Sequence, residues 1–586
     1  MQNRKFIFIS IGLIIILSFA IYSNSIDGGF IWDDKDLIKD NIYIKDWSYL
    51  PDIFTKHIGA GGDAKYFSYR PVQMITYMIN YSLCGLDVRV YHFTNILLHV
   101  LATLAIYWLI SVLYGDRLLS LFASILFVSH PVHVAAVTYM SGRADSLALM
   151  FMAVCFILYI KNLNTAKIST YALVLLTYMF ALLSRENSLI FPALVLLYHY
   201  AFKKRISPRN FFPILGVAFI YIVMRLTFLK SLVPHIESPN TLFQRLPGFF
   251  VAITNYMKII FFPVDLHMEY GPKLFNFQNP KAILGVFILL SLLTYAFRKR
   301  DRNRLVFFSV FWFFIALLPL SNLYPIPIAY MAEHWLYIPS IGFFLLLANV
   351  LTWLYRTKKI KILAIGLITF LLVFYSSLTI RYNEYWKKPI AFYERVLKYA
   401  PDATRTLNSL AFAYSDIGRK EEAIALFKKA IEIRPKYRAT YNNLGVLYYN
   451  LSRYKEAIDL YNKAIETDPN NSRTYNNLGN SYSAIGQEER AIAAYKKAIE
   501  INPNSAAAYN NLGVTYYDLD RFKEAIAAHK KTIEINPRFA NAHFNLSLCY
   551  FYEKQYDLAV RYCDLAIKHG YKADPRFLEE LKPYRK

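Results

Sequence analysis

Apolar runs dominate the first two thirds of this chain and stop near residue 380. Eleven of them approach the ~20 residues that a helix needs to cross a bilayer, and they lie at about 6–23, 91–113, 118–137, 144–160, 168–184, 187–202, 209–229, 280–297, 304–320, 335–355 and 360–379. Hydrophobic residues make up 56% of the chain, above the roughly 45–50% of soluble proteins. The sequence after residue 380 is polar and periodic. We therefore expect an all-α protein with a polytopic membrane domain and a separate soluble domain.

Basic residues between the apolar runs indicate which loops face the cytoplasm. Arg4 and Lys5 precede the first run, and further basic clusters lie at 116–117, 161–167, 203–205, 298–300 and 356–361. All of them fall on the side of the N-terminus if a further run at about 246–263 does not cross, as the positive-inside rule expects. We therefore predict eleven spans, an interfacial or re-entrant helix at 246–263, a cytoplasmic N-terminus and an extracytoplasmic second domain. The net charge of +25 then reflects membrane topology, and no nucleic-acid partner is expected.

The first apolar run resembles a signal peptide but has no small-residue cleavage site. Because more spans follow it, we interpret it as a retained signal-anchor. The sequence contains no clear organelle signal, so we expect a prokaryotic plasma membrane, with the endoplasmic reticulum membrane as the alternative.

A repeat of 34 residues begins at Pro401. Proline recurs at 435, 469, 503 and 537, and Tyr-Asn-Asn-Leu-Gly begins at Tyr441, Tyr475 and Tyr509. The period and the small packing residues resemble the tetratricopeptide repeat, in which pairs of helices stack into a solenoid. We predict a membrane domain at 1–386, a linking half-repeat helix at 387–401, five repeats at 402–571 and a capping tail at 572–586.

One asparagine recurs in the first helix of successive repeats, as Asn443, Asn477, Asn511 and Asn545. Such stacks form a concave groove that usually binds a peptide, and a side-chain amide can both donate to and accept from a peptide backbone. These residues are therefore candidates for a peptide-binding ladder. The alternative, consensus packing or capping within the stack, stays equally open.

Polar motifs of the membrane domain gather in loops that are predicted to face outward. The first is Asp33-Asp34, which follows Phe30-Ile31-Trp32 in an outer loop at about 24–90. The others contain Arg70, His92, His133, Arg143, Arg185, Glu186, Glu333 and His334. Charged side chains at the edge of a bilayer are costly unless they serve a functional site. These residues therefore predict a functional pocket on the outer face.

In their order along the chain, these motifs resemble the transmembrane and tetratricopeptide-repeat-containing O-mannosyltransferases and their prokaryotic relatives. They include Tyr69-Arg70-Pro71-Val72, His130-Pro131-Val132-His133, Ser141-Gly142-Arg143-Ala144-Asp145, Ser184-Arg185-Glu186-Asn187 and Glu333-His334-Trp335. The resemblance covers about residues 20–400 and the repeats. It implies a GT-C glycosyltransferase fold, a polyprenyl-phosphate-linked sugar as donor, and a catalytic carboxylate that aligns with Asp33. One departure is Val134-Ala135-Ala136, where relatives carry an acidic residue.

The chemistry of such a transfer suggests roles for these residues. Asp33 or Asp34 would accept the proton of the acceptor hydroxyl. Arg70, Arg143 and Arg185 would hold the departing phosphate, and His92, His133, Glu186, Glu333 and His334 would support the pocket. A single displacement would invert the anomeric centre. No cofactor is expected, and a divalent metal is not favoured because the pair His130 and His133 lacks a nearby acidic partner.

Structural roles are the alternatives for the same residues. Asp33-Asp34 could cap a short helix, Arg70 and Arg143 could extend toward lipid headgroups, and Arg185-Glu186 could be a structural ion pair. Buried histidines such as His92 could simply be hydrogen-bonded core residues.

Two functions follow from these interpretations. The first is a membrane protein O-glycosyltransferase, with mannose as the expected sugar, Ser or Thr hydroxyls as acceptors, and the repeats recruiting the polypeptide. The second is a membrane-anchored repeat scaffold without catalysis. An anchor needs one span rather than eleven, so we favour the enzyme.

Overall fold

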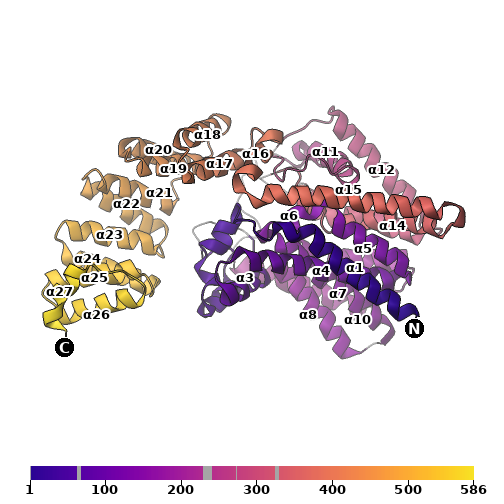
Figure 1. The fold of residues 1–586 in the computed structure, drawn as a ribbon, viewed down its shortest axis with the longest axis horizontal. Helices are drawn as coiled ribbons and strands as arrows, with labels where there is room; N and C mark the ends of the chain where they lie inside the picture. The colour runs from indigo at the N-terminus through magenta and orange to yellow at the C-terminus, as the bar shows by residue number, and fades with distance from the viewer. Residues whose placement is uncertain are drawn as a thin grey trace. The chain divides into compact units, whose positions relative to one another are not determined.

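The computed structural model describes residues 2–61, 68–165, 167–228, 241–271, 273–321, 323 and 329–585. All regular structure in these ranges is helical (Figure 1). The chain divides into two compact units, Met1–Ala403 and Thr404–Lys586. The predicted fold class, a membrane helical domain followed by an α-solenoid of repeats, is confirmed, and the number of spans stays a prediction.

The first unit contains sixteen α-helices within the described ranges, joined by short 3₁₀ turns and by one π-helical turn, η2 (Lys35–Lys39). They are α1 (Gln2–Tyr22), α2 (Leu50–Thr55), α3 (Pro71–Cys84), α4 (Val88–Tyr114), α5 (Arg117–Ser129), α6 (Val134–Val137), α7 (Arg143–Thr165), α8 (Ile168–Ser184), α9 (Phe191–Ala201), α10 (Pro208–Phe228), α11 (Leu242–Phe261), α12 (Pro280–Lys299), α13 (Arg304–Leu317), α14 (Ser340–Arg356), α15 (Lys361–Lys387) and α16 (Pro389–Tyr399). Each predicted apolar run overlaps at least one of these helices, but the run at 118–137, which the sequence predicts as one span, is broken after Ser129 into α5 and α6.

Six helical stretches in the described part of the chain are long and apolar enough to cross a membrane: Arg4–Ser25, Val88–Tyr114, Met140–Leu163, Pro208–Thr227, Pro280–Lys299 and Lys358–Lys387. A seventh would be α5 together with Pro131–Val137, which bends by 59°. Three shorter apolar helices cover Ile168–Ser184, Arg304–Leu320 and Ser340–Arg356. The ambiguous run at 246–263 forms α11, which is not among the six and packs against α12 (Figure 1).

The bend after α5 produces a buried turn segment, residues 130–142, that is central to the site. Proline 131 has no backbone N–H and cannot continue the helix beyond Ser129, so the chain passes through two short 3₁₀ turns, η5 (Pro131–His133) and η6 (Met140–Gly142), before α7. At Gly142 an added Cβ would lie 2.5 Å from the carbonyl oxygen of Ala135. Only glycine therefore allows the segment to fold back so closely.

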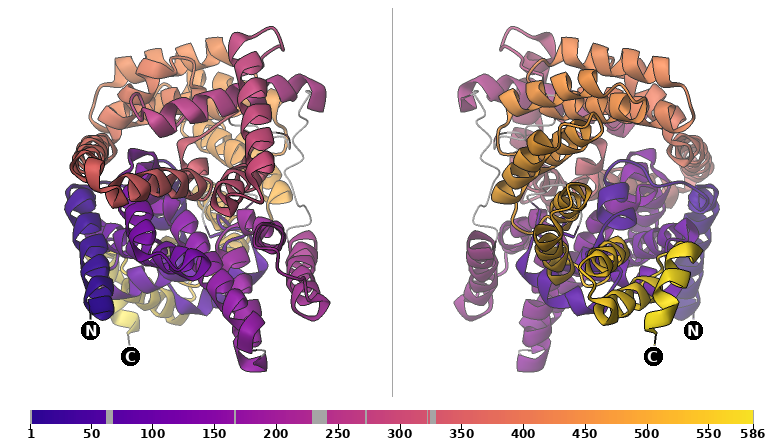
Figure 2. Two further views of the ribbon diagram at one scale, coloured as in Figure 1. Left: turned by 90° about the vertical axis from the view of Figure 1, so that its right-hand side faces the viewer. Right: turned by 90° about the vertical axis from the view of Figure 1, so that its left-hand side faces the viewer.

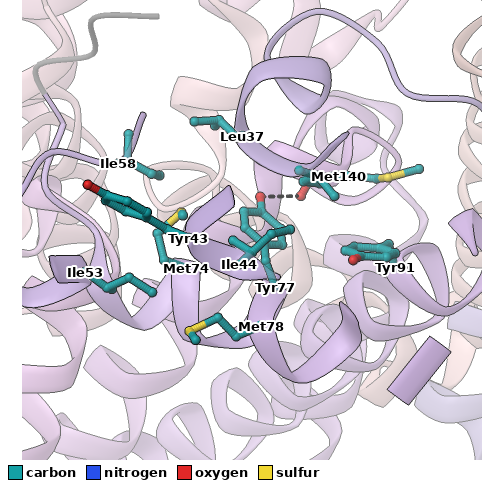
Figure 3. Packing of buried hydrophobic residues seen from close by; sticks show 11 residues of the cluster. Leu37, Tyr43, Ile44, Ile53, Ile58, Met74, Tyr77, Met78, Tyr91 and Met140 are labelled. Carbon is teal, nitrogen blue, oxygen red and sulfur yellow. Dashed lines mark hydrogen bonds between the residues drawn. The ribbon is translucent and has the colours of Figure 1, made fainter. Parts of the chain in front are cut away.

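The predicted outer loop at 24–90 docks on this turn segment through a hydrophobic cluster. Its buried members come from the loop, from α3 and α4, and from the segment itself: Leu37, Ile38, Tyr43, Ile44, Ile53, Ile58, Met74, Tyr77, Met78, Tyr91 and Met140 (Figure 3). Tyr77 also donates a hydrogen bond of 3.2 Å to the carbonyl of Met140. Residues 62–67 of the loop lie outside the described residues. The cluster fixes the loop that carries Asp33 against the helices.

The second unit consists of five helix pairs and a C-terminal helix. The pairs are α17 (Thr404–Asp416) with α18 (Lys420–Ile433), α19 (Arg438–Asn450) with α20 (Tyr454–Thr467), α21 (Ser472–Ser483) with α22 (Glu488–Ile501), α23 (Ala506–Asp518) with α24 (Phe522–Ile535), and α25 (Ala540–Tyr552) with α26 (Tyr556–Lys568). Successive pairs pack on one another (Figures 1 and 2). The last helix is α27 (Pro575–Leu581), whose Phe577 joins the final hydrophobic cluster.

The recurring glycines allow the two helices of a repeat to pack closely against each other. A Cβ at Gly445 or Gly479 would lie 2.6 or 2.5 Å from the ring of Tyr461 or Tyr495. The linking helix α16, which the sequence predicts as a half-repeat, belongs to the first unit. There its Phe392 packs on Trp386 of α15, with ring centroids 4.3 Å apart.

Candidate active site

The carboxylate pair Asp33-Asp34 lies in a loop that the turn segment holds by hydrogen bonds. The backbone N–H of Asp33 donates to the hydroxyl of Tyr139 at 3.0 Å. Asp34 is 1% exposed, and its Oδ1 accepts hydrogen bonds from the backbone N–H and the hydroxyl of Ser141 at 2.8 and 2.5 Å. Its Oδ2 accepts from the N–H of Ile31 at 3.2 Å. The two acidic residues are therefore not equivalent.

Access distinguishes the two carboxylates. Asp34 is enclosed, and both of its oxygens are occupied by donors from the fold, whereas Asp33 is only partly buried. Burial raises the pKa of Asp34 to about 7, although the hydrogen bonds from Ser141 and Ile31 act in the opposite direction. A pKa near neutrality would suit a base, but a base must first reach its substrate. The geometry thus favours Asp33 for contact with substrate and Asp34 for holding the loop.

The residue before the pair has an unusual backbone conformation. Trp32 has a φ of +49°, in the left-handed region that costs an ordinary residue ~1–2 kcal/mol. Its ring packs against Phe392, with ring centroids 4.9 Å apart, and its backbone N–H donates to the hydroxyl of Tyr393 at 3.4 Å. Such strain persists where the surroundings hold it, and it is frequent at functional sites.

A cluster of opposite charges lies one helical turn beyond Ser141. Asp145 in the first turn of α7 forms an ion pair with Arg185, and Ser141 and Asp145 are four residues apart, or ~6 Å along a helix. Near Arg185, Arg70 donates to Glu186 at 3.0 Å, and Arg225 approaches the other oxygen of Glu186 at 3.7 Å. We call these five residues the cationic cluster.

The cationic cluster carries a net positive charge in a buried setting. Three guanidinium groups face two carboxylates, and none of the five side chains is more than 20% exposed. Burial would raise the pKa of Glu186, but Arg70 and Arg225 lower it to about 2, so this carboxylate stays ionised. The surplus cation makes the cluster suited to an anionic group.

Polar atoms without partners occur around the cluster. Arg185 Nε, Asn187 Nδ2 and His334 Nδ1 are buried and have no hydrogen-bond partner among the described residues. Burial, and the charges of Arg185 and Arg70, hold the pKa of His334 well below its ordinary value, so its imidazole is neutral. Unsatisfied buried groups are rare in folded proteins, and here they point toward a ligand with several acceptor oxygens.

Arg143 lies apart from this cluster, in a structural environment. The side chain is fully buried; Nε donates to Asn95 at 2.8 Å, one Nη to Asn80 at 2.7 Å, and the other Nη to the carbonyl of Tyr91 at 3.1 Å. The guanidinium also covers the ring of Tyr77 at 4.4 Å. This arrangement favours a role in joining α3, α4 and α7, and the predicted contact of Arg143 with phosphate stays untested.

The histidines of the predicted pocket are hydrogen-bonded core residues. His92 contacts the carbonyl of Gly28 at 3.0 Å. Both ring nitrogens of His133 are engaged, Nδ1 with the carbonyl of Phe127 at 2.7 Å and Nε2 with the hydroxyl of Ser340 at 3.0 Å. Within the described ranges, neither His92 nor His133 belongs to a group of three or more His, Cys, Asp or Glu side chains that could hold a metal ion.

Glu333, in the 3₁₀ turn η9 (Glu333–Leu336), holds a neighbouring loop. Its Oε1 accepts hydrogen bonds from the N–H of His267 at 2.6 Å and from the hydroxyl of Tyr270 at 2.8 Å. The next residue in the turn is His334 beside the cationic cluster. One short turn therefore connects the cluster with the loop at 265–270.

The recurring asparagines bond to one another between repeats. The side-chain amide of each donates to an asparagine 35 residues earlier: Asn443 to Asn408, Asn477 to Asn442, Asn511 to Asn476 and Asn545 to Asn510, at 3.1–3.3 Å. All four are half-buried. The side-chain amide N–H groups therefore stabilise the stack of repeats, which favours a packing role for them. Peptide binding by these asparagines stays a prediction.

Several site residues have no clear signal in the sequence. Ser141 and Asp145 lie in a motif that the sequence analysis singled out, but their bonds to Asp34 and Arg185 are not evident from it. Tyr139 and Arg225 resemble ordinary residues of apolar segments. For Arg225 the signal would have been a lone charge within an apolar run, which is costly without a partner.

Known proteins resemble both units. Models of the tetratricopeptide repeat match residues 413–452, 437–504 and 506–539. The protein O-mannosyl-transferase F38B6.6 of Caenorhabditis elegans is 27% identical over 441 residues, which cover 70% of this chain and 61% of the relative. The protein O-mannosyl-transferase TMTC3 of Mus musculus is 22% identical over 483 residues, or 71% of this chain and 50% of the relative.

The chain is thus similar to curated protein O-mannosyl-transferases over about 70% of its length. The resemblance inferred from the motifs is therefore confirmed, and so is the presence of tetratricopeptide repeats. The chain spans between half and about three fifths of the length of the two curated relatives. Among solved structures, the crystal structure of MamA is 28% identical and aligns over 30% of this chain and 98% of its own, with a TM-score of 0.26.

Proposed function

We propose that this protein is a membrane glycosyltransferase that moves a sugar, with mannose the first candidate, from a polyprenyl-phosphate carrier to Ser or Thr hydroxyls of proteins. One observation carries the proposal. The strained Asp33 loop and the buried cationic cluster are held by the same short stretch, in which Tyr139 and Ser141 bind the loop and Asp145 binds Arg185. The names of the homologues support the same reaction.

In this mechanism Asp33 acts as the general base. The acceptor oxygen attacks the anomeric carbon while its proton passes to the Asp33 carboxylate. The bond between that carbon and the phosphate oxygen breaks, and the phosphate leaves with the electron pair. Because one displacement occurs without a covalent intermediate, the configuration at the anomeric carbon is inverted. Asp34 and Ser141 do not react in this scheme and keep the loop in position.

The cationic cluster would bind the leaving phosphate. Arg70 and Arg185 present planar guanidinium groups, which suit the oxygens of a phosphate. As the bond to the sugar breaks, negative charge grows on the phosphate, and fixed cations in a site of low dielectric stabilise it. Arg225 provides the surplus positive charge of the cluster. The neutral imidazole of His334 offers a further hydrogen bond.

We assign the remaining parts by the same reasoning. The apolar helices hold the enzyme in the membrane, where the polyprenyl chain of the donor also lies. The loops with Asp33 and the cluster face the extracytoplasmic side, and the repeats recruit the polypeptide acceptor. A prokaryotic plasma membrane is the expected location.

The test uses the full-length protein in lipid nanodiscs, with polyprenyl-phospho-mannose or polyprenyl-phospho-glucose as donor and a Ser/Thr-rich protein as acceptor. Modified residues are mapped by mass spectrometry. Asp33→Asn should lower the transfer rate by ~10²–10⁴-fold, while Asp40→Asn, which changes an exposed carboxylate of the same loop, should not. Arg185→Gln should raise the KM for the donor.

The outcomes separate enzyme from scaffold. A wild-type rate in Asp33→Asn would remove Asp33 from the mechanism. If the wild-type protein transfers neither sugar but binds polypeptides through its repeats, the catalytic proposal fails and the membrane-anchored scaffold takes its place.

A further inference from the structure

A second feature of the first unit lies beside the Asp33 loop and has no role in the mechanism so far. It is a pocket at the surface of the first unit, lined by aromatic, apolar and charged side chains. Its walls are the loop at 265–270, the end of α15 and one face of α16, and Glu333 lines it as well. We call it the α15–α16 pocket.

The loop that forms one wall is held in a strained conformation. Asp265 and Met268 have φ values of +66° and +64°, although neither is glycine. Besides the bonds from Glu333, Arg395 donates to the carbonyl of Leu266 at 2.9 Å, and Tyr399 donates to Asp265 at 2.9 Å. Several hydrogen bonds therefore hold this loop in a strained backbone conformation. Strained backbone of this kind is frequent at binding sites.

The opposite wall is aromatic and basic. Tyr382, Tyr385 and Trp386 of α15 line the pocket. The guanidinium carbon of Arg395 lies 4.8 Å from the ring centre of Tyr382 and 4.3 Å from that of Tyr385. Flat aromatic faces with a few polar groups at their edges are the surfaces on which extended peptide segments dock.

The pocket contacts the Asp33 loop through two aromatic side chains. Trp386 packs on the ring of Tyr139 at 5.4 Å, and the hydroxyl of Tyr139 accepts the N–H of Asp33. Phe392, which also lines the pocket, packs on Trp32, the residue before Asp33. A ligand in the pocket would therefore lie against the same side chains that position the proposed base.

We propose that the α15–α16 pocket binds the residues that flank the acceptor Ser or Thr in an extended polypeptide. The inference rests on the proposed function and adds a subsite for the acceptor. The donor phosphate has its own anchor in the cationic cluster, so a separate pocket beside Asp33 serves the second substrate. One wall, α16, ends at Tyr399, and the first repeat helix begins at Thr404, so the subsite adjoins the repeats along the chain.

Steady-state kinetics of full-length variants in nanodiscs test this subsite. Tyr385→Ala and Arg395→Ala each remove a half-exposed side chain that lines the pocket. Each should raise the KM for a Ser/Thr peptide about tenfold, the usual consequence of losing one aromatic or cation–aromatic contact. The KM for the polyprenyl-phosphate sugar should stay unchanged. Lys398→Ala, which removes an exposed basic residue of α16 outside the pocket, is the matched control.

A cross-linking experiment tests the peptide subsite even if the variants fold poorly. A photoreactive phenylalanine analogue at position 385 should capture a labelled Ser/Thr peptide, and unlabelled peptide should compete. An unchanged peptide KM in both variants of an active enzyme, or capture that only the lipid-linked sugar competes, would overturn the subsite. If the wild-type enzyme transfers no sugar but position 385 still captures the peptide, the proposed function fails and the peptide site stands.

Discussion

Ser141→Ala is the most informative single change at the Asp33 loop. It removes one hydroxyl, whose hydrogen bond to Asp34 is 2.5 Å long, and it leaves the backbone bonds of Ser141 and Ile31 to the same carboxylate. Neither Asp33 nor the cationic cluster is altered. The variant therefore tests whether the position of the loop, rather than its chemistry, sets the rate.

The expected magnitude follows from two numbers. A hydrogen bond to a charged group stabilises a fold by about 1.5–3 kcal/mol. The left-handed conformation of Trp32 costs ~1–2 kcal/mol, so the lost bond is comparable to the strain that the loop must hold. If the whole loss is felt in the transition state, kcat falls roughly 10- to 150-fold, since 1.36 kcal/mol is a factor of ten in rate.

The pH profile distinguishes a positioning role from general damage. The hydrogen bond from Ser141 lowers the pKa of Asp34, so its loss should raise that pKa. Because ionised Asp34 holds the loop that carries the base Asp33, the acidic limb of kcat should then move to higher pH. Transfer is assayed in nanodiscs with saturating donor and acceptor between pH 5 and 9. Ser146→Ala is the control, because Ser146 is also buried and its hydroxyl bonds to Tyr337 at 2.9 Å instead.

Two results would refute this reasoning. A wild-type kcat in Ser141→Ala would show that Asp34 does not position the loop through this bond. An equal loss in Ser141→Ala and Ser146→Ala, with no shift in the pH profile of either, would indicate a general loss of folded enzyme.

Two further variants test the pKa of Asp34 and the asparagine ladder. Because burial raises the pKa of Asp34 to about 7 from 3.8, the folded state binds an extra proton between these values, and its stability falls as pH rises through this window by up to about 1.4 kcal/mol per pH unit. Asp34→Asn should remove this slope in thermal unfolding between pH 5 and 7, and parallel slopes for both proteins would contradict the assignment. Asn511→Ala deletes hydrogen bonds to Asn476 at 3.1 Å and Asn480 at 2.9 Å, so it should lower the free energy of unfolding of the repeats by ~1–3 kcal/mol in urea. Asn504→Ala, at an exposed turn, should leave that energy unchanged, and equal effects of the two asparagine variants would argue against the ladder.

The sequence was most informative where its signals are local or periodic. Most apolar runs coincide with one helix because a helix that crosses a bilayer needs about 20 consecutive apolar residues, and the run at 118–137 is the exception because Pro131 interrupts it. The repeats were evident because each one has the same packing requirements, which place glycine opposite the rings of Tyr461 and Tyr495. The order of the motifs also indicated the resemblance to protein O-mannosyl-transferases.

The sequence was less informative about individual roles within the motifs. It could not separate Asp33 from Asp34, because two adjacent carboxylates look alike until one is buried against Ser141. Arg143 and Arg185 are both arginines in motifs that the sequence predicts to face outward. The fold surrounds Arg143 with neutral acceptors but places Arg185 among charges.

By itself, the sequence determined that this is an all-helical protein with a membrane part, a repeat part and polar motifs between the spans. Only the tertiary structure decided which of those polar residues meet. Tyr139 reaches Asp33 across 106 positions of the chain, and Arg70 reaches Glu186 across 116. Such pairs depend on how helices far apart in the chain pack together, and no local pattern of residue types records that packing.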